Sequence, residues 1–321
     1  MTPTSSTFSI VIPLYNEELN IIPLCDEIFS VMNTDFIGSN YEVILVNDGS
    51  TDWTREKMVE LKNLNKKCEF KCINLQRNYG QSIALEVWFR NSKWEYIISL
   101  DWDNQNDPKD IKKLYDKMIK DNLDVVTGRR KKRKDPLSVR IITRCSRFFR
   151  NILLGDRVHD SWCTLRIYKK SCIENLHLWW EMHRYIAEIL TIKGYNVWEV
   201  PVNHRSRTNW FSKYTWKKSI KWFIDLLYIR FIAKYQSRPL HLFWFIWLST
   251  FLLGIISFIY SIYAKIVLWL SLNRSGFFLL WVFLIQTWIM IFIFWIVIDI
   301  LIRIYYNSWN EKRYVIKEII E

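Results

Sequence analysis

Short apolar runs alternate with longer amphipathic stretches over residues 1–209 of the chain. Apolar runs of this length are typical of buried β-strands, and the stretches between them carry apolar residues at helical spacing. Because strands and helices alternate, we predict an α/β domain with a mostly parallel sheet and helices on both faces. The predicted strands are residues 8–13, 41–46, 69–75, 96–100, 123–127, 165–168 and 195–202, and the clearest helices are 16–32, 108–120 and 183–193.

Two long apolar runs follow at residues 242–264 and 277–298, and neither contains Asp, Glu, Lys, Arg or His. About 20 apolar residues cross a bilayer core, so we predict a two-helix transmembrane hairpin within residues 240–304, its second helix reaching about residue 300. Nine Lys or Arg lie in residues 203–239, two in the connecting residues 265–276 and four after Asp299. By the positive-inside rule, the α/β domain and a tail of residues 305–321 face the cytoplasm.

Residues 210–239 join the two parts and mix lysines with aromatic residues. At helical spacing, residues 214–234 give an apolar face beside a basic one, which predicts amphipathic helices lying in the membrane interface. An ordinary amphipathic core helix would show a similar pattern, and it is kept as the alternative.

The charge balance of the chain agrees with a membrane-bound protein. Lys and Arg number 45 against 32 Asp and Glu, a net charge of +13, and 17% of the residues are aromatic. Basic charge with abundant aromatic residues favours an anionic membrane surface over nucleic acid, for which no basic-aromatic module is recognisable. The six cysteines form no Cys-x-x-Cys pair, which disfavours a zinc site and indicates free thiols in a reducing cytosol. Residues 1–7 do not form a signal peptide.

Asp101 and Asp103 stand where the predicted strand 96–100 ends. Ligands of open α/β sheets bind outside the carboxyl ends of the strands, and paired carboxylates there suit Mg²⁺ or Mn²⁺. Such a cation can be shared with phosphate oxygens. A solvated acidic turn is the alternative for this motif when it is considered alone.

Ten Lys or Arg lie within residues 128–155. A run of charge is usually a solvated face, which is one interpretation of this stretch. The second interpretation is that these side chains bind phosphate groups, because anionic ligands need cationic partners.

Several motifs, in order along nearly the whole chain, resemble the polyprenyl-phosphate glycosyltransferase group of family 2 glycosyltransferases. That group includes dolichol-phosphate mannose synthase, bactoprenol glucosyltransferase and undecaprenyl-phosphate aminoarabinose transferase. The motifs are Val-Ile-Pro-Leu-Tyr-Asn-Glu at 11–17, Val-Asn-Asp-Gly-Ser-Thr-Asp at 46–52, Arg-Asn-Tyr-Gly-Gln at 77–81, Leu-Asp-Trp-Asp-Asn-Gln-Asn at 100–106, Asp160 with Arg-Ile-Tyr at 166–168, and Ser-Lys-Tyr at 212–214.

The resemblance implies a GT-A nucleotide-diphosphosugar fold, which is Rossmann-like, and assigns roles to individual residues. Catalysis would involve Asp160 as general base, with Asp103 and Arg166, and Asp101 with Asp103 would bind Mg²⁺ or Mn²⁺. The nucleotide-sugar site would consist of Pro13, Tyr15, Glu17, Asp48, Asp101 and Gln105. Lipid phosphate or diphosphate would contact Arg129, Arg133, Arg166, Ser212 and Lys213, for which local salt bridges are the alternative role of each basic residue.

The implied reaction is an inverting transfer of a sugar from a nucleotide-diphosphosugar to undecaprenyl or dolichyl phosphate. The bacterial appearance of residues 77–81 and 105–106 favours a UDP-sugar over GDP-mannose. The product would be a lipid-phosphate-linked monosaccharide for a cell-envelope glycan or glycolipid, made at the cytoplasmic membrane. Relatives are often tetramers, so a homo-oligomer is implied as well.

The chain departs from the family pattern at three positions: Asn47 replaces the usual Asp, Trp102 separates the metal aspartates in place of a small residue, and Phe211 replaces a Gly. These departures affect the choice of donor more than the reaction class. Two other functions are the alternatives. A processive polysaccharide synthase would carry a Gln-x-x-Arg-Trp motif and more membrane spans, neither of which is found. A catalytically silent membrane scaffold would not need Asp101, Asp103 and Asp160 together.

Overall fold

The computed structural model describes most of the α/β part of the chain. The described residues are 6–64, 68–130, 150–151, 158–174, 176–178, 181–205, 224–231, 276–308 and 314–320, with single residues 256, 259, 260, 263, 266 and 267. The chain divides into two compact units, residues 1–233 with 314–321, and residues 234–313. Each unit is described by itself.

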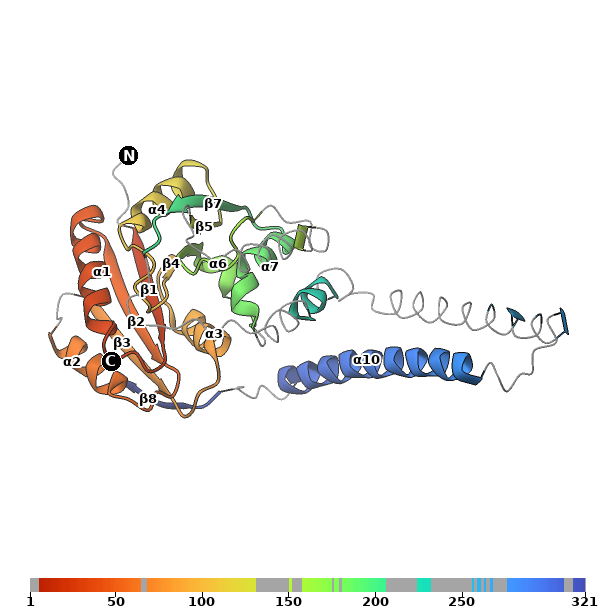
Figure 1. The fold of residues 1–321 in the computed structure, drawn as a ribbon. Helices are drawn as coiled ribbons and strands as arrows, with labels where there is room; N and C mark the ends of the chain where they lie inside the picture. The colour runs from red at the N-terminus through yellow and green to blue at the C-terminus, as the bar shows by residue number, and fades with distance from the viewer. Residues whose placement is uncertain are drawn as a thin grey trace. The chain divides into compact units, whose positions relative to one another are not determined.

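An eight-stranded sheet in the order β7-β5-β6-β4-β1-β2-β3-β8 forms the centre of the first unit (Figure 1). Four pairings are parallel (β1–β2, β2–β3, β1–β4 and β5–β7), whereas β6 is antiparallel to β4 and β5, and β8 is antiparallel to β3. The sheet is therefore mixed, and the predicted mostly parallel sheet needs this correction. The strands are β1 Thr7–Leu14, β2 Asn40–Asn47, β3 Glu69–Leu75, β4 Tyr96–Ser99, β5 Val125–Arg130, β6 Arg166–Lys169, β7 Val197–Val202 and β8 Ile316–Ile320.

Helices cover both faces of this sheet, as predicted. Side chains of a strand alternate between its two faces. Ile10 and Ile12 of β1 belong to one large apolar cluster with residues of α1 (Ile21–Asp35) and α4 (Asp110–Lys120), whereas Val11 between them is buried outside that cluster. Helix α3 (Gln81–Asn91) contacts β1 and β2. The remaining helices of this unit are α2 Thr54–Leu64, α6 Lys170–Ile173, η1 Met182–Tyr185 and α7 Ile186–Ile192.

Strand β8 was not predicted, because residues 305–321 were interpreted as a tail. In the structure its residues Ile316–Ile320 pair with β3, so that a segment from the far end of the sequence completes the edge of the sheet (Figure 1).

Helix α10 (Gly276–Ser308) belongs to the second unit and includes the residues of the second predicted span. In the part of the chain that the structure describes, no helix meets the combined length and hydropathy required of a membrane span. The predicted two-helix hairpin stays a prediction, and most of its first helix lies outside the described residues.

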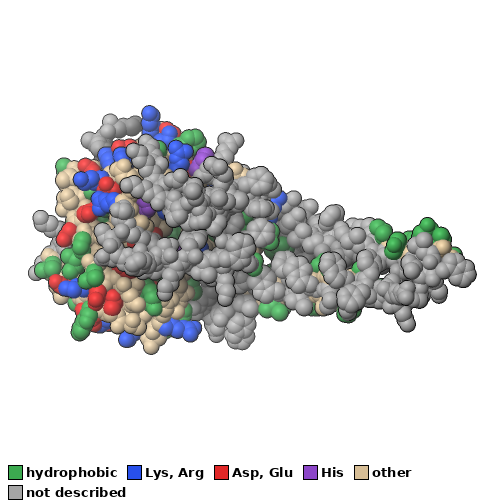
Figure 2. All heavy atoms as spheres, in the orientation of Figure 1, with side chains coloured by type: hydrophobic (Ala, Val, Ile, Leu, Met, Phe, Trp, Pro, Cys, Tyr) green, Lys and Arg blue, Asp and Glu red, His purple; other side chains and the backbone are tan. Residues whose placement is uncertain are grey.

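Only residues 224–231 of the predicted interfacial segment are described, and they are helical. Leu226, Ile229 and Phe231 are buried, and the predicted placement of residues 210–239 in the membrane interface stays a prediction. Figure 2 shows acidic and basic side chains interspersed on the visible described surface of the first unit, so the net positive charge does not form one patch there.

Candidate active site

The loops that carry the predicted site residues lie at one edge of the sheet. Strands β1 to β4 are mutually parallel, so their carboxyl ends share this edge. Strand β6 is antiparallel to β4 and to β5, so β5 also ends there and β6 begins there. The edge therefore brings together the loops after β1, β2, β3, β4 and β5 with the segment that precedes β6, which is the usual ligand-binding side of an α/β sheet.

Asp48 is fixed by backbone amides. Its carboxylate accepts hydrogen bonds from the backbone N–H groups of Tyr79, at 2.7 Å, and Gly80, at 2.8 Å, while its own N–H donates to the Leu14 carbonyl. The residue is 4% exposed. Burial raises the pKa of Asp48, and the two amide donors oppose that rise.

The turn that carries Asp48 (residues 47–52, the Asp48 turn) packs directly on the loop after β3 (residues 76–80, the Tyr79 loop). Gly49 has φ +68°, and a Cβ built on it would lie 2.4 Å from the Arg77 carbonyl carbon. Only glycine fits this contact, because a side chain would both clash and disfavour the left-handed backbone.

The loop after β1 is bound to the Asp48 turn and to the start of α2. The backbone N–H of Asn16 donates to Ser50 Oγ, and that of Glu17 donates to Thr54 Oγ1. The three predicted nucleotide-site residues of this region lie at the end of β1 or just beyond it: Pro13 is buried in the strand, Tyr15 is 42% exposed and Glu17 is partly buried.

Asp101 and Asp103 lie in the loop between β4 and α4. Asp101 Oδ1 accepts from Gln81 Nε2 at 2.9 Å, and Asp103 Oδ1 accepts from the Gln105 N–H at 3.2 Å. Burial first, and then repulsion from Asp103, raise the pKa of Asp101 to about 6. A hydrogen bond from Thr164 and the positive charges of Arg166 and Arg130 act in the opposite direction on this pKa.

The same loop carries features that suit a cation. Asn104 has φ +54°, and its buried Oδ1 has no hydrogen-bond partner among the described residues. Those residues contain no cluster of three or more His, Cys, Asp or Glu side chains placed to hold a metal. Asp101 and Asp103 therefore fit Mg²⁺ or Mn²⁺ only when phosphate or water oxygens complete the coordination, which is usual for Mg²⁺. Trp102 between them packs against the apolar core.

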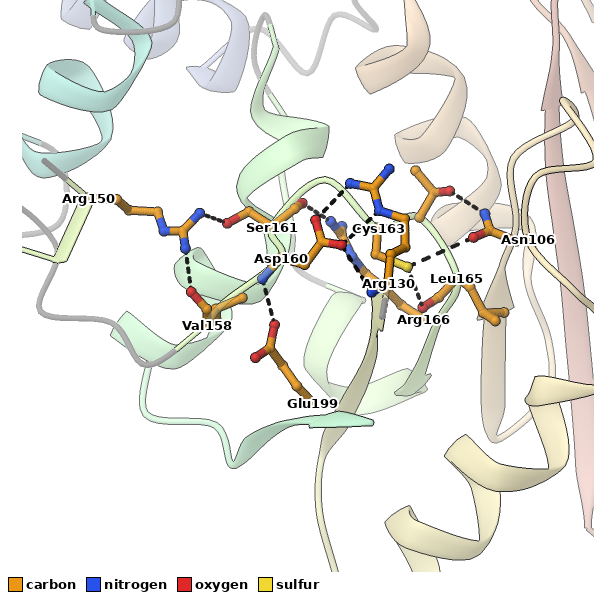
Figure 3. A network of polar contacts seen from close by, with 11 residues as sticks. Asn106, Arg130, Arg150, Val158, Asp160, Ser161, Cys163, Leu165, Arg166 and Glu199 are labelled. Carbon is orange, nitrogen blue, oxygen red and sulfur yellow. Dashed lines mark hydrogen bonds and ion pairs between the residues drawn. The ribbon is translucent and has the colours of Figure 1, made fainter. Parts of the chain in front are cut away.

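Asp160 is held by a side chain that the sequence analysis did not single out (Figure 3). Arg130, the last residue of β5, donates to Asp160 through Nε and Nη2, both at 2.7 Å, and through its backbone N–H at 3.2 Å. The Asp160 N–H donates to Glu199 Oε1 of β7 at 2.8 Å. The pair is largely buried, with 12% and 7% of the two side chains exposed, and the Asp160 carboxylate raises the pKa of Arg130.

Arg166 lies beneath this segment and is 2% exposed. Its guanidinium group donates to the carbonyls of Ser161, at 2.5 Å, and His183, at 3.1 Å. Arg150 donates to Ser161 Oγ and to the Val158 carbonyl (Figure 3). In this structure Arg166 thus supports the backbone next to Asp160, and its predicted contact with phosphate stays a prediction.

The predicted phosphate-binding residues are placed unequally. Arg129 is exposed near the end of β5. Arg133, Ser212 and Lys213 lie outside the described residues. Arg130, Gln81 and Glu199 are partners of the predicted site residues that the sequence did not indicate, because each contact joins residues at least 20 positions apart.

Comparisons with known proteins identify the family of the chain. Residues 9–177 match the glycosyl transferase family 2. The chain is 30% identical over 323 residues to the dodecaprenyl-phosphate galacturonate synthase of Rhizobium johnstonii, covering 99% of this chain and 94% of that protein. It is 30% identical over 219 residues to the undecaprenyl-phosphate 4-deoxy-4-formamido-L-arabinose transferase of Salmonella paratyphi B, covering 68% of this chain and 66%, just under two thirds, of that relative.

Solved structures share the fold at low sequence identity. A mannosyltransferase from Pyrobaculum calidifontis, in complex with GDP-Man and Mn²⁺, has a TM-score of 0.52 and 18% identity over 72% of this chain and 64% of that one. Glucosyl-3-phosphoglycerate synthase from Mycobacterium tuberculosis, in complex with Mn²⁺, UDP-glucose and phosphoglyceric acid, has a TM-score of 0.54 and 15% identity over 70% and 80%. The chain therefore has a GT-A-like fold and belongs to glycosyl transferase family 2, in the group of polyprenyl-phosphate glycosyltransferases.

Proposed function

We propose that this enzyme transfers a sugar from a nucleotide-diphosphosugar to a polyprenyl phosphate. The observation that carries the proposal is the placement of Asp48, the Asp101–Asp103 pair and Asp160 in segments that meet at one edge of the sheet. Two of its relatives, each matched over two thirds or more of this chain, are named as sugar transferases to dodecaprenyl and undecaprenyl phosphate.

In the proposed reaction, an oxygen of the lipid phosphate attacks the anomeric carbon of the sugar. The bond from that carbon to the diphosphate breaks, the nucleoside diphosphate leaves, and the configuration inverts. Asp48 accepts N–H or O–H donors of the nucleoside, because an ionised carboxylate is an acceptor only. A bound Mg²⁺ or Mn²⁺ would offset the charge that develops on the leaving diphosphate.

Asp160 orients the acceptor in this proposal. A phosphate monoester is largely ionised near neutral pH, because its second pKa is about 6, so little proton removal is needed. Arg130 presents a positive charge beside Asp160, and the pair together offers a carboxylate for a hydroxyl or phosphate proton and a guanidinium for phosphate oxygens.

The donor is proposed to be a UDP-sugar, with GDP-mannose as the alternative. The motifs at residues 77–81 and 105–106 support this preference. The shared fold does not decide it, because the solved structures with this fold include complexes with GDP-Man and with UDP-glucose.

The apolar segments are proposed to form a hairpin in the cytoplasmic membrane, with the α/β domain on the cytoplasmic side. The support is the uncharged sequence of residues 242–264 and 277–298, together with exposed apolar side chains along α10 such as Phe283, Phe294 and Leu301. Recovery of the protein in the carbonate-washed membrane pellet supports this placement, and complete release into the carbonate supernatant contradicts it.

A membrane assay tests the reaction. Membranes containing the full chain are incubated with polyprenyl phosphate and radiolabelled nucleotide sugars, with and without EDTA. Label that enters the chloroform phase and is lost with EDTA is the expected result. Label that enters a water-soluble polymer would instead support a polysaccharide synthase, and no transfer from any donor would support a silent scaffold.

The Asp103→Ala variant tests the metal assignment in the same assay. Removal of one of the two carboxylates is expected to lower kcat by about 100-fold or more, the size of effect seen when one transition-state charge contact is lost. The melting temperature is expected to change little, because Asp103 lies in a loop. Normal transfer by a folded Asp103→Ala enzyme would refute the assignment.

A further inference from the structure

Strand β8 makes contacts on the donor side of the sheet that the proposed function leaves unexplained. We propose that β8 is a positioning element of the nucleotide pocket: through Val315 and Glu318 it fixes the Tyr79 loop and the Asp48 turn, and thereby sets the affinity for the nucleoside diphosphate part of the donor. This inference rests on the proposed function, because it concerns the same pocket.

The first connection runs from β8 to the Tyr79 loop. The Val315 N–H donates to the hydroxyl oxygen of Tyr79 at 3.2 Å, and the Val315 carbonyl accepts from the Gln76 N–H at 3.0 Å. The regular register between β3 and β8 shifts at Asn74 and Leu75, so Val315 meets the loop after β3. Tyr79 therefore contacts β8 through its side chain and Asp48 through its backbone.

The second connection runs from β8 to the Asp48 turn through two buried asparagines. Glu318 Oε1 accepts from Asn74 Nδ2 at 3.1 Å, and Asn74 Oδ1 accepts from Asn47 Nδ2 at 2.9 Å. Asn47 Oδ1 in turn accepts from the Ser50 N–H at 2.9 Å, which closes the turn around Asp48. Each amide side chain in this relay uses both a donor and an acceptor, so its orientation is fixed at both ends.

Arg55 of α2 holds Glu318 in place. The guanidinium group of Arg55 donates to both carboxylate oxygens, with Nη2 2.9 Å from Oε2 and Nε on Oε1. This contact lowers the pKa of Glu318, so the side chain is a carboxylate at neutral pH. Planar pairs of this kind add geometric precision as well as charge attraction.

The two connections act on the same group. Asp48 depends on the Tyr79 and Gly80 amides for its orientation, and Gly49 leaves no space between the Asp48 turn and the Tyr79 loop. A shift of either segment would therefore move the carboxylate that meets the nucleoside. A misplacement of about 1 Å in a binding site is enough to cost much of its affinity or rate.

The test compares variants of the full chain in membranes or detergent. Glu318→Ala removes the connection to Asn74, and Tyr79→Phe removes only the hydroxyl oxygen that accepts from Val315 while it keeps the backbone contact with Asp48. Lys317→Ala is the matched control, because Lys317 lies in the same strand and its side chain is exposed. Binding of UDP and of GDP with Mn²⁺, the KM for the active nucleotide sugar and kcat are measured for each.

We expect each of the two variants to weaken nucleoside diphosphate binding and to raise KM by about three- to tenfold, the equivalent of one hydrogen bond. The expected kcat stays within about twofold, and Lys317→Ala matches the wild type. Glu318→Gln keeps an acceptor oxygen and is expected to recover part of the affinity. If β8 only covered the edge of the sheet, its variants would lower the melting temperature and leave KM unchanged.

The outcomes separate the inference from the function on which it rests. Wild-type binding and transfer, with unchanged KM in folded Tyr79→Phe and Glu318→Ala proteins, overturn the inference alone. Absence of UDP and GDP binding by the wild type overturns the proposed function. Should Glu318→Ala not fold, the Tyr79→Phe protein decides the question, because it keeps the pairing of β8 with β3 and the contacts of Glu318.

Discussion

Asp48 and Asp160 are both buried acids at the same edge of the sheet, and they are held in different ways. Asp48 is oriented by the backbone amides of Tyr79 and Gly80, which only a substitution to proline would remove. Asp160 is oriented mainly by the side chain of Arg130. Backbone N–H donors orient a carboxylate without adding a formal charge, whereas the guanidinium adds a full positive charge beside the carboxylate.

The difference suits the roles that we propose for the two acids. The N–H and O–H groups of a nucleoside have fixed positions, so a rigidly held carboxylate at Asp48 is suited to accept hydrogen bonds from them. The acceptor phosphate brings charge into the site, and the Arg130–Asp160 pair can exchange one of its contacts for the phosphate. Variants of the two acids and of their partners test this difference between Asp48 and Asp160.

Asp160→Asn is expected to lower kcat by about 100- to 10,000-fold, the range for a group that acts in acid–base catalysis or directly orients the attacking atom. KM for the nucleotide sugar is expected to change little, because Asp160 is proposed to contact the acceptor phosphate and not the nucleoside. Steady-state transfer assays with both substrates varied give the two constants. An enzyme with near-normal kcat would remove Asp160 from the reaction.

Arg130→Ala is expected to destabilise the fold by about 3–5 kcal/mol, because it leaves the buried Asp160 without its charge partner. The double variant Arg130→Ala with Asp160→Ala should regain part of that loss, which urea unfolding measures. Lys93→Ala is the control, since its exposed pair with Glu69 contributes at most about 1 kcal/mol. Equal losses of unfolding free energy in Arg130→Ala and in the double variant would show that the Arg130–Asp160 ion pair contributes little to stability.

Gly49→Ala should lower the free energy of unfolding by about 1–2 kcal/mol because of the left-handed backbone at this position. The clash of the added Cβ with the Arg77 backbone should cost about 1–3 kcal/mol more. Gly38→Ala isolates the first contribution, because φ is +81° at Gly38 and nothing lies within 4 Å of its added Cβ. Thermal unfolding of the two variants gives the difference. Equal losses would mean that the two loops do not press on each other.

Asp48→Asn is expected to cost about 1–3 kcal/mol of stability, since the side-chain NH2 group takes the place of one carboxylate oxygen and faces a backbone N–H donor that it cannot accept from. Donor KM should rise while the response to lipid phosphate concentration stays the same. Chemical unfolding and substrate titrations measure the two effects. An unchanged donor KM would place the nucleoside elsewhere.

The residue pattern was sufficient to predict the parallel strands and the edge of the sheet that gathers the candidate site residues. Apolar runs such as residues 8–13 and 41–46 indicate buried strands, and the polar turn that follows each run marks the end of the strand. Helices on both faces of the sheet were predicted from the alternation of strands and helices along the chain. The placement of Asp48, Asp101 and Asp103 at the strand ends followed from this alternation.

Contacts between distant or chemically similar residues could not be predicted in this way. Arg130 is one of several consecutive basic residues, and only the antiparallel pairing of β5 with β6 places it beside Asp160. Arg166 was assigned to a phosphate because its family motif suggested a ligand, while the structure shows it donating to two backbone carbonyls. Strand β8 is identified as a strand by its pairing with β3, which is far away in the sequence.

The bond between Asn74 and Glu318 joins residues that are 244 positions apart. While the ribosome makes the polypeptide, β3 must therefore wait with one side unpaired, for roughly 10–50 s at the usual elongation rate of about 5–20 residues per second. An unpaired strand readily recruits another strand. A chaperone that shields this edge during synthesis would consequently protect the nascent enzyme from aggregation.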